Sequence, residues 1–231
     1  MLGIRGVVGV LVAVVLSGCG ATPTTGDAVP TTAPTTAATA SDPGSGGEIR
    51  DVRGFTGVDL ASVGELRIDQ TGTESLSIQA DADVLPLLTS EVSDGVLVLG
   101  VVPGSEIVDS GPIVYTLTVA TLDSITVSGA GDATAANVAT DRLTVELSGA
   151  GDVTASGAAD AQSVTISGTG KYDGEDLQSA TAEVDVNGAG SAVVRVSDRL
   201  DAAVGGVGSV EYIGDPQVTE DVSGVGSIQQ R

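Results

Sequence analysis

The sequence contains no histidine, no tryptophan and only one cysteine, and its single lysine is Lys171. Without histidine the chain lacks the usual general base at neutral pH and the commonest protein ligand of transition metals. The Ser-His-Asp and Cys-His arrangements of nucleophilic catalysis are excluded for the same reason. We therefore expect a protein that is not an enzyme, with no catalytic residues, no bound metal and no cofactor.

Basic residues are scarce as a class. Nine lysines and arginines stand against 31 aspartates and glutamates, and the formal net charge is −22. A chain with this charge repels phosphate backbones and anionic lipid surfaces. Nucleic acid is therefore excluded as a partner.

Aromatic residues are limited to one phenylalanine and three tyrosines, although 41% of the residues are hydrophobic. A core of Val, Ile, Leu and Ala fills thin layers of small side chains, which favours β structure over a helical bundle. The few rings also argue against a sugar-cleaving groove, because aromatic side chains are the usual stacking platforms there. The length of 231 residues fits one domain and a tail.

The beginning of the sequence has the pattern of a bacterial secretion signal. Arg5 begins a short basic region, the apolar stretch VVGVLVAVV follows, and LSGC ends the segment at Cys19. LSGC resembles the lipobox of bacterial lipoproteins, in which the signal is cut before the cysteine and the sulfur carries diacylglycerol. The resemblance implies a signal peptide over residues 1–18 and a protein held outside the cytoplasm by lipid on Cys19, so that the membrane is a partner. The alternatives are a plain signal peptide or a short membrane anchor with an incidental thiol.

Residues 19–48 form the predicted linker. After Cys19 this segment is rich in Thr, Ala, Pro, Ser and Gly and has almost no large apolar side chains, so it cannot build a core and is predicted to be disordered. As a random coil it would average about 30 Å from end to end. That length would hold the folded domain, predicted over residues 49–231, clear of a membrane surface.

Short half-buried strands are predicted between residues 50 and 122, because apolar residues alternate with polar ones there. One helical turn is expected in the segment 81–92, where Pro86 interrupts it. SDG at 93–95 predicts a hairpin turn, and a strong strand follows at 113–119. The inward side chains of these strands are predicted to be Val58, Leu60, Leu66, Ile68, Leu76, Ile78, Ile113, Tyr115, Leu117 and Val119.

Beyond residue 122 the chain repeats itself with a G-x-G pair in each copy, at steps of 20, 19, 20, 18 and 18 residues. Apolar residues recur two positions before and two positions after each pair. A unit of this length cannot bury its own apolar face, and it does so by stacking on copies of itself. The repeats predict an all-β, single-stranded β-helix, a solenoid of 18–20-residue coils over about 122–228. The corner glycines are Gly129, Gly131, Gly149, Gly151, Gly168, Gly170, Gly188, Gly190, Gly206, Gly208, Gly224 and Gly226.

The G-x-G pairs do not match known phosphate-binding motifs. A dinucleotide fingerprint needs a third glycine three residues after the second, and no copy has one. The stretch GTGKY at 168–172 departs from a P-loop, since Tyr172 stands where that motif has Ser or Thr. We expect the glycines to be structural, at corners where the backbones of neighbouring coils approach closely.

An acidic column follows the second glycine of the first two copies, at Asp132 and Asp152. In stacked coils the two carboxylates lie about one strand spacing apart, with Lys171 next in line. One hypothesis is that Lys171 offsets the repulsion between the two aspartates. The alternative is a cation-dependent glycan contact or a polysaccharide-active site at Asp132 and Asp152, because paired carboxylates serve both purposes.

The segment from about Val52 to Ile228 resembles the "putative auto-transporter adhesin" family with the head GIN domain. The resemblance rests on RGFTGVDLASVGELRIDQ, on SLSIQADADVLPLLTSEVSDGVLVLGV and on the rungs TVSGAGD, ELSGAGD, TISGTGK and DVNGAGS. It implies a secreted or lipid-anchored envelope protein built as a right-handed β-helix, without established catalytic residues. The last two copies depart to GGVGS and SGVGS with a shorter period, which suits coils near a capped end.

Two classes of function follow from these observations. The first is a cell-surface scaffold or adhesion module that presents Thr, Ser, Asp and Asn to a glycan, cell-wall or protein ligand. The second is an enzyme or cation-dependent binder acting on polysaccharide through Asp132 and Asp152.

Overall fold

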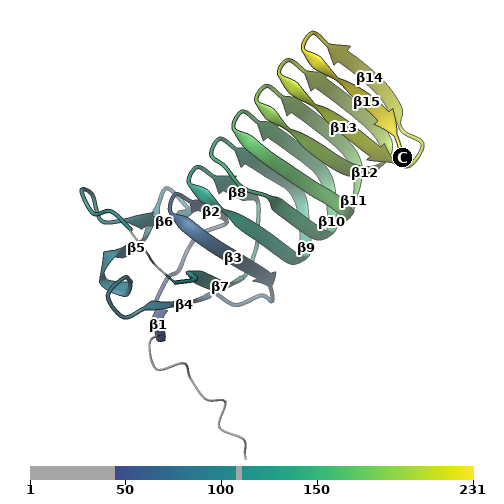
Figure 1. The fold of residues 1–231 in the computed structure, drawn as a ribbon. Coiled ribbons are helices and arrows are strands. Elements are labelled where there is room, and N and C mark those ends of the chain that lie inside the picture. The colour runs from purple at the N-terminus through teal and green to yellow at the C-terminus, as the bar shows by residue number, and fades with distance from the viewer. Residues whose placement is uncertain (1–44, 108–110) are drawn as a thin grey trace, which may run out of the picture. The chain divides into compact units, whose positions relative to one another are not determined.

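The computed structural model describes residues 45–107 and 111–231, which belong to one compact unit, Ser41–Arg231 (Figure 1). The predicted signal peptide, Cys19 and most of the predicted linker lie outside the described residues. No helix in the described part of the chain is long and apolar enough to cross a membrane.

The described chain is built almost entirely of strands. The elements are β1 (Ser45–Arg50), β2 (Gly57–Leu60), β3 (Val63–Gln70), β4 (Ser75–Asp81), the 3-10 turn η1 (Leu85–Leu87), β5 (Leu88–Ser93), β6 (Val96–Val101), β7 (Val114–Val119), β8 (Ser124–Val127), β9 (Ala130–Leu147), β10 (Val153–Ile166), β11 (Thr169–Val186), β12 (Ala189–Val204), β13 (Val207–Ile213), β14 (Gln217–Val222) and β15 (Val225–Gln230).

The repeats form the predicted solenoid, in which successive coils pair as parallel strands. Each coil has a segment that follows its G-x-G corner, here called side A, and a segment that precedes the next corner, called side B. Between them lies the lateral turn, where the chain passes from side A to side B. Figure 1 shows β9 to β13 stacked in order along the axis. The solenoid prediction is therefore confirmed.

The predicted core column before each corner is confirmed in five of its six members. The register aligns Leu147 with Ile166 and Ile166 with Val186, and these side chains are buried, as are Val127 and Val204. The sixth member, Val222 in β14, is 44% exposed. No described strand lies beyond β14 and β15, so the last coil leaves its apolar residues uncovered.

The strands β2 and β3 form a further coil that the repeat analysis placed outside the solenoid. β2 pairs in parallel with β8, and β3 pairs in parallel with β9. The pairing aligns Gly64 with Gly131, and a Cβ on Gly129 would meet the carbonyl oxygen of Ser62. The corner is therefore present at 62–64, with serine in place of the first glycine.

The end of the solenoid near β2 and β3 is closed by antiparallel strands. On side A, β7 pairs in parallel with β3, and β4 and then β1 follow antiparallel. On side B, β6 pairs in parallel with β2, and β5 pairs antiparallel with β6. Antiparallel strands of this kind cover an edge that would otherwise pair with another chain. The expectation that the shorter copies mark the capped end is wrong, because the cap lies at the opposite end.

Of the local predictions for this capping region, the hairpin turn at 93–95 is confirmed, whereas the helical turn and the start of the domain differ from what was expected. The turn at 94–95 joins β5 to β6, with positive φ at both Asp94 and Gly95, as a tight hairpin turn requires. The helical turn was expected to precede Pro86, but the structure places Pro86 inside the short 3-10 turn η1, where a proline in the first turn is tolerated. β1 begins at Ser45, four residues before the predicted start of the domain.

The corner glycines lie where coil meets coil. A Cβ on Gly149 would come within 1.9 Å of the carbonyl oxygen of Gly129, and a Cβ on Gly168 within 2.0 Å of the carbonyl oxygen of Gly149. The same carbonyl oxygens accept backbone hydrogen bonds from the next coil, as Thr169 N–H donates to Gly149 O at 3.0 Å. Glycine is therefore needed for the close approach that this hydrogen-bond ladder requires.

Candidate functional site

The structure places Asp132 and Asp152 in neighbouring coils on side A, both exposed to solvent. They line a shallow recess of about 560 Å³. Within the described ranges, no three acidic or other metal-binding side chains are grouped so as to hold a metal ion. The two carboxylates thus lie in neighbouring coils, as the repeat predicted, but no third metal-binding side chain joins them in the described ranges.

Each carboxylate of this pair accepts a hydrogen bond from the backbone of the next coil. Asp132 Oδ1 accepts from the N–H of Asp152 at 2.9 Å, and Asp152 Oδ1 accepts from the N–H of Lys171 at 2.8 Å. β10 begins only at Val153, so the strand pairing is interrupted at this corner. The side chains supply the acceptors that the interrupted ladder lacks. The Lys171 ammonium pairs with Asp173 at 3.2 Å, and not with Asp132 or Asp152, whose mutual repulsion it was expected to offset.

We expect Asp152→Ala to lower the free energy of unfolding by about 1 kcal/mol, or the melting temperature by about 2–4 °C. The reason is the loss of the acceptor for the Lys171 N–H. Asp152→Asn keeps an acceptor oxygen and removes the charge, so it should melt close to the unchanged protein in a calorimetric scan. A loss in Asp152→Asn as large as in Asp152→Ala would contradict this structural role.

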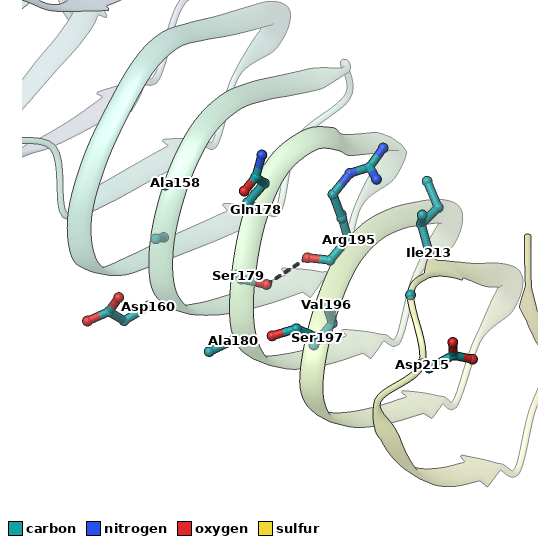
Figure 2. A pocket seen from close by; sticks show the side chains of 12 residues that line it. Ala158, Asp160, Gln178, Ser179, Ala180, Arg195, Val196, Ser197, Ile213 and Asp215 are labelled. Atoms are coloured by element: carbon teal, nitrogen blue, oxygen red, sulfur yellow. Dashed lines mark hydrogen bonds between the residues drawn. The ribbon is translucent and has the colours of Figure 1, made fainter.

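A second candidate site is a groove at the lateral turns of four successive coils (Figure 2). Its volume is about 570 Å³, and it is lined by residues 158–160, 178–180, 195–197 and 213–215. The register pairs residue 158 with 178, 178 with 195, and 195 with 213. The first residues of the four segments therefore form one row along the solenoid axis, the second residues form a second row, and the third residues form a third. Each row is about 14 Å long, which corresponds to three strand spacings.

The three rows give the groove a floor and two walls. The floor is the middle row, which is small or buried: Ala159, Ser179, Val196 and Gly214. The first row forms one wall, here called the arginine wall: Ala158, Gln178, Arg195 and Ile213. The third row forms the other, called the aspartate wall: Asp160, Ala180, Ser197 and Asp215. Figure 2 shows Gln178 and Arg195 extending on one side of the segments.

A change in coil length accompanies this groove. The coil from Gly170 to Gly190 has 20 residues, and the coil from Gly190 to Gly208 has 18. The register between β11 and β12 shifts at 174–178 and again at 179–181, so the residues that β12 lacks are lost at its lateral turn. The change in coil length therefore falls within the segments that line the groove.

A buried chain of hydrogen bonds supports the groove from inside. Tyr172 Oη donates to Gln162 Oε1 at 3.1 Å, and Gln162 Nε2 donates to Ser179 Oγ at 2.7 Å. Ser179 Oγ donates in turn to the carbonyl oxygen of Arg195 at 2.9 Å, the bond drawn in Figure 2. The side chains of Tyr172, Gln162 and Ser179 are thus all hydrogen-bonded. This buried network holds the backbone of the groove floor in one position.

Arg195 differs from the other basic residues near it. Among residues 45–107 and 111–231, all basic side chains except Arg142 and Arg195 form an ion pair; the paired residues are Arg50, Arg53, Arg67, Lys171, Arg199 and Arg231. The Arg195 Nε donates to the carbonyl oxygen of Glu175 at 2.6 Å. This bond fixes the guanidinium and leaves the two Nη groups without a partner in the described part of the chain.

The groove and Arg195 were not predicted from the sequence. The shortening of the period from 20 to 18 residues was visible in the sequence, but its location in the lateral turn follows only from the strand register. Cys19, the predicted lipidation site, lies outside the described residues and stays a prediction.

Comparisons with known proteins agree with the fold. A solved structure from Bacteroides fragilis, described as a "putative adhesin", is 25% identical and superposes with a TM-score of 0.70, covering 82% of this chain and 98% of its own. A "putative lipid binding protein" from Parabacteroides distasonis is 17% identical, with a TM-score of 0.53 over 82% of this chain and 98% of its own; at that identity it shows the fold alone. No curated protein matches the chain.

The family comparison covers most of the domain. Residues 54–216 match the model of a family described as "Putative auto-transporter adhesin, head GIN domain". The match begins before the first coil and ends after the lateral turn of β13. It therefore includes the capping strands β4 to β7, the groove and all of the corner glycines except Gly224 and Gly226, and it leaves out β1. The chain therefore belongs to this adhesin family.

Proposed function

We propose that this protein is a surface adhesion module, held to the cell membrane by lipid on Cys19 and without enzymatic activity. The family membership supports an adhesion role, and the lipobox-like LSGC stretch supports the anchor. A linker with the composition of the segment after Cys19 would hold the solenoid clear of the membrane. The solenoid then presents its sides to a ligand outside the cytoplasm.

The observation that favours this function most is the groove at the lateral turns. It has a rigid floor, two walls of different chemistry and a guanidinium without an ion pair in the described chain. Concave surfaces with a few fixed polar groups are the usual form of ligand sites. We assign the ligand contact to this groove. The competing assignment is the recess at Asp132 and Asp152, where one oxygen of each carboxylate already accepts a backbone hydrogen bond.

Two bulky substitutions separate these assignments. Ser197 is exposed on the aspartate wall, and Thr154 is exposed at the recess of the acidic pair. We expect Ser197→Trp to reduce binding of the purified full chain to isolated cell-wall fragments by at least about tenfold, a loss of about 1.4 kcal/mol, because the indole fills the groove. Thr154→Trp should leave that binding unchanged.

The reverse result, loss in Thr154→Trp and none in Ser197→Trp, would assign the contact to the acidic pair and contradict the proposal. Loss in neither variant would contradict a contact at either place. Fractionated cells test the anchor in parallel, because Cys19→Ser should move the chain from the membrane fraction to the soluble fraction.

A further inference from the structure

The two walls of the groove require opposite hydrogen-bonding groups from a ligand. On the arginine wall, the Nη groups of Arg195 are donors only and carry positive charge. On the aspartate wall, Asp160 and Asp215 stand at the two ends and are acceptors only when ionised. A ligand that lies along the groove must therefore present an acceptor to one wall and donors to the other.

The acceptor that fits the arginine wall best is a carboxylate. The Nε of Arg195 is engaged by Glu175 O, so the guanidinium offers its two Nη groups end-on. A planar carboxylate can accept both hydrogen bonds at once. A phosphate monoester would bring about two negative charges at neutral pH and would be repelled more strongly by Asp160 and Asp215.

The donors that fit the aspartate wall are hydroxyl groups. A ligand with a negative charge on every unit is disfavoured by the net charge of −22 and by the wall itself. A saccharide with one carboxylate among neutral sugars avoids this repulsion, because its hydroxyls can donate to Asp160 and Asp215. The polar middle of the walls, Gln178 and Ser197, can exchange hydrogen bonds with further hydroxyls.

We propose that the groove binds an acidic oligosaccharide whose single carboxylate is held by Arg195 and whose hydroxyls face the aspartate wall. This inference rests on the proposed adhesion function and names its ligand class. Stacking rings are not required for such a ligand, because the charge-assisted pair at Arg195 supplies the specific contact. An acidic peptide is disfavoured, since its backbone and apolar side chains offer few donors to Asp160 and Asp215.

The test compares acidic saccharides with their neutral parents on the unchanged full chain. The pairs are sialyllactose with lactose, and cellobiouronic acid with cellobiose; the methyl ester of each acidic member removes the charge and keeps the shape. We expect at least one acidic member to bind more than about tenfold more tightly than both its parent and its ester in calorimetric titration. Equal affinities within every set would overturn the proposal, as would preferential binding of oligoglutamate.

Variants then locate the contact. Arg195→Gln should weaken binding of the acidic saccharide by about 10- to 100-fold and bring it to the level of the neutral parent. Arg142→Gln is the matched control, because this substitution removes the same charge at a position outside the groove. Like Arg195, Arg142 has no ion pair in the described part of the chain. An equal loss in both variants would mean long-range attraction alone and would overturn the assignment to Arg195.

The saccharide titrations test the ligand class, and the retention of Ser197→Trp on cell-wall fragments tests the adhesion function, so the two proposals can fail separately. If Ser197→Trp abolishes retention on cell-wall fragments but no acidic saccharide is preferred, the groove is the adhesion site and its ligand class is wrong. If Ser197→Trp has no effect on retention, the proposed function fails at this groove, whatever the saccharide titrations show.

Discussion

Gly149→Ala is expected to lower the melting temperature by about 6–12 °C. The new Cβ would lie 1.9 Å from the carbonyl oxygen of Gly129 and 2.8 Å from the backbone of Ser128. Neither atom belongs to a flexible side chain, so neighbouring coils must separate at a corner where Ala150 N–H donates to Gly129 O at 3.0 Å. Overpacking against rigid neighbours costs about 3 kcal/mol, which corresponds to that shift for a domain of this size.

Gly47 provides the matched control for this substitution. It lies in β1, is exposed, and a Cβ there would meet no atom within 4 Å. Gly47→Ala should therefore change the melting temperature by less than about 2 °C. If Gly149→Ala melted within the same range as Gly47→Ala, the corner glycines would not be needed for close stacking of the coils.

Stability is expected to fall steeply above about pH 10. Burial raises the pKa of Tyr172 above its ordinary value of 10.0, and the nearby Asp173 adds to that rise. Burial likewise raises the pKa of Tyr115. Above about pH 10 the unfolded chain loses these two protons while the folded chain keeps them, so each group removes about 1.4 kcal/mol of stability per pH unit until its folded pKa is reached.

Denaturant unfolding between pH 8 and 12 measures this slope. Tyr172→Phe removes one of the two groups and should reduce the slope above about pH 10 by about 1.4 kcal/mol per pH unit. The substitution also deletes the hydrogen bond to Gln162, which lowers stability at every pH, so the comparison is between slopes and not absolute values. An unchanged slope would show that Tyr172 ionises in the folded protein.

The solenoid was predictable because its signal is local and repeated. The G-x-G pairs and the apolar residues around them recur often enough to determine the period, and the period determines which side chains share a column. Val127, Leu147 and Ile166 were predicted in one column and are buried in register. The prediction failed at Val222, because a column is buried only where another coil or a cap covers it.

The first coil was not predictable from the period. Ser62 stands where the other corners have glycine, and the capping strands β4 to β7 separate this coil from the next one. The roles of individual side chains were less accessible still. Asp132 and Asp152 were expected side by side, but their use as backbone acceptors depends on where the strand ladder breaks. Arg195 had no repeat signal, since its position results from a register shift between two coils.

The groove lies at the lateral turns, which are the part of the coils whose length changes between β11 and β12. Sides A and B of the coils are fixed by core columns and corner glycines, and their length in residues varies little. The lateral turns, in contrast, differ in length from coil to coil without disturbing the core, as the shift between β11 and β12 shows.

Amide chemical-shift mapping of the isotope-labelled protein during titration with sialyllactose and cellobiouronic acid tests the ligand site most directly. We expect the shifts to gather at residues 158–160, 178–180, 195–197 and 213–215, and we expect the corresponding neutral sugars to leave these residues unshifted. Shifts gathered around Asp132 and Asp152, with the lateral groove silent, would contradict this expectation.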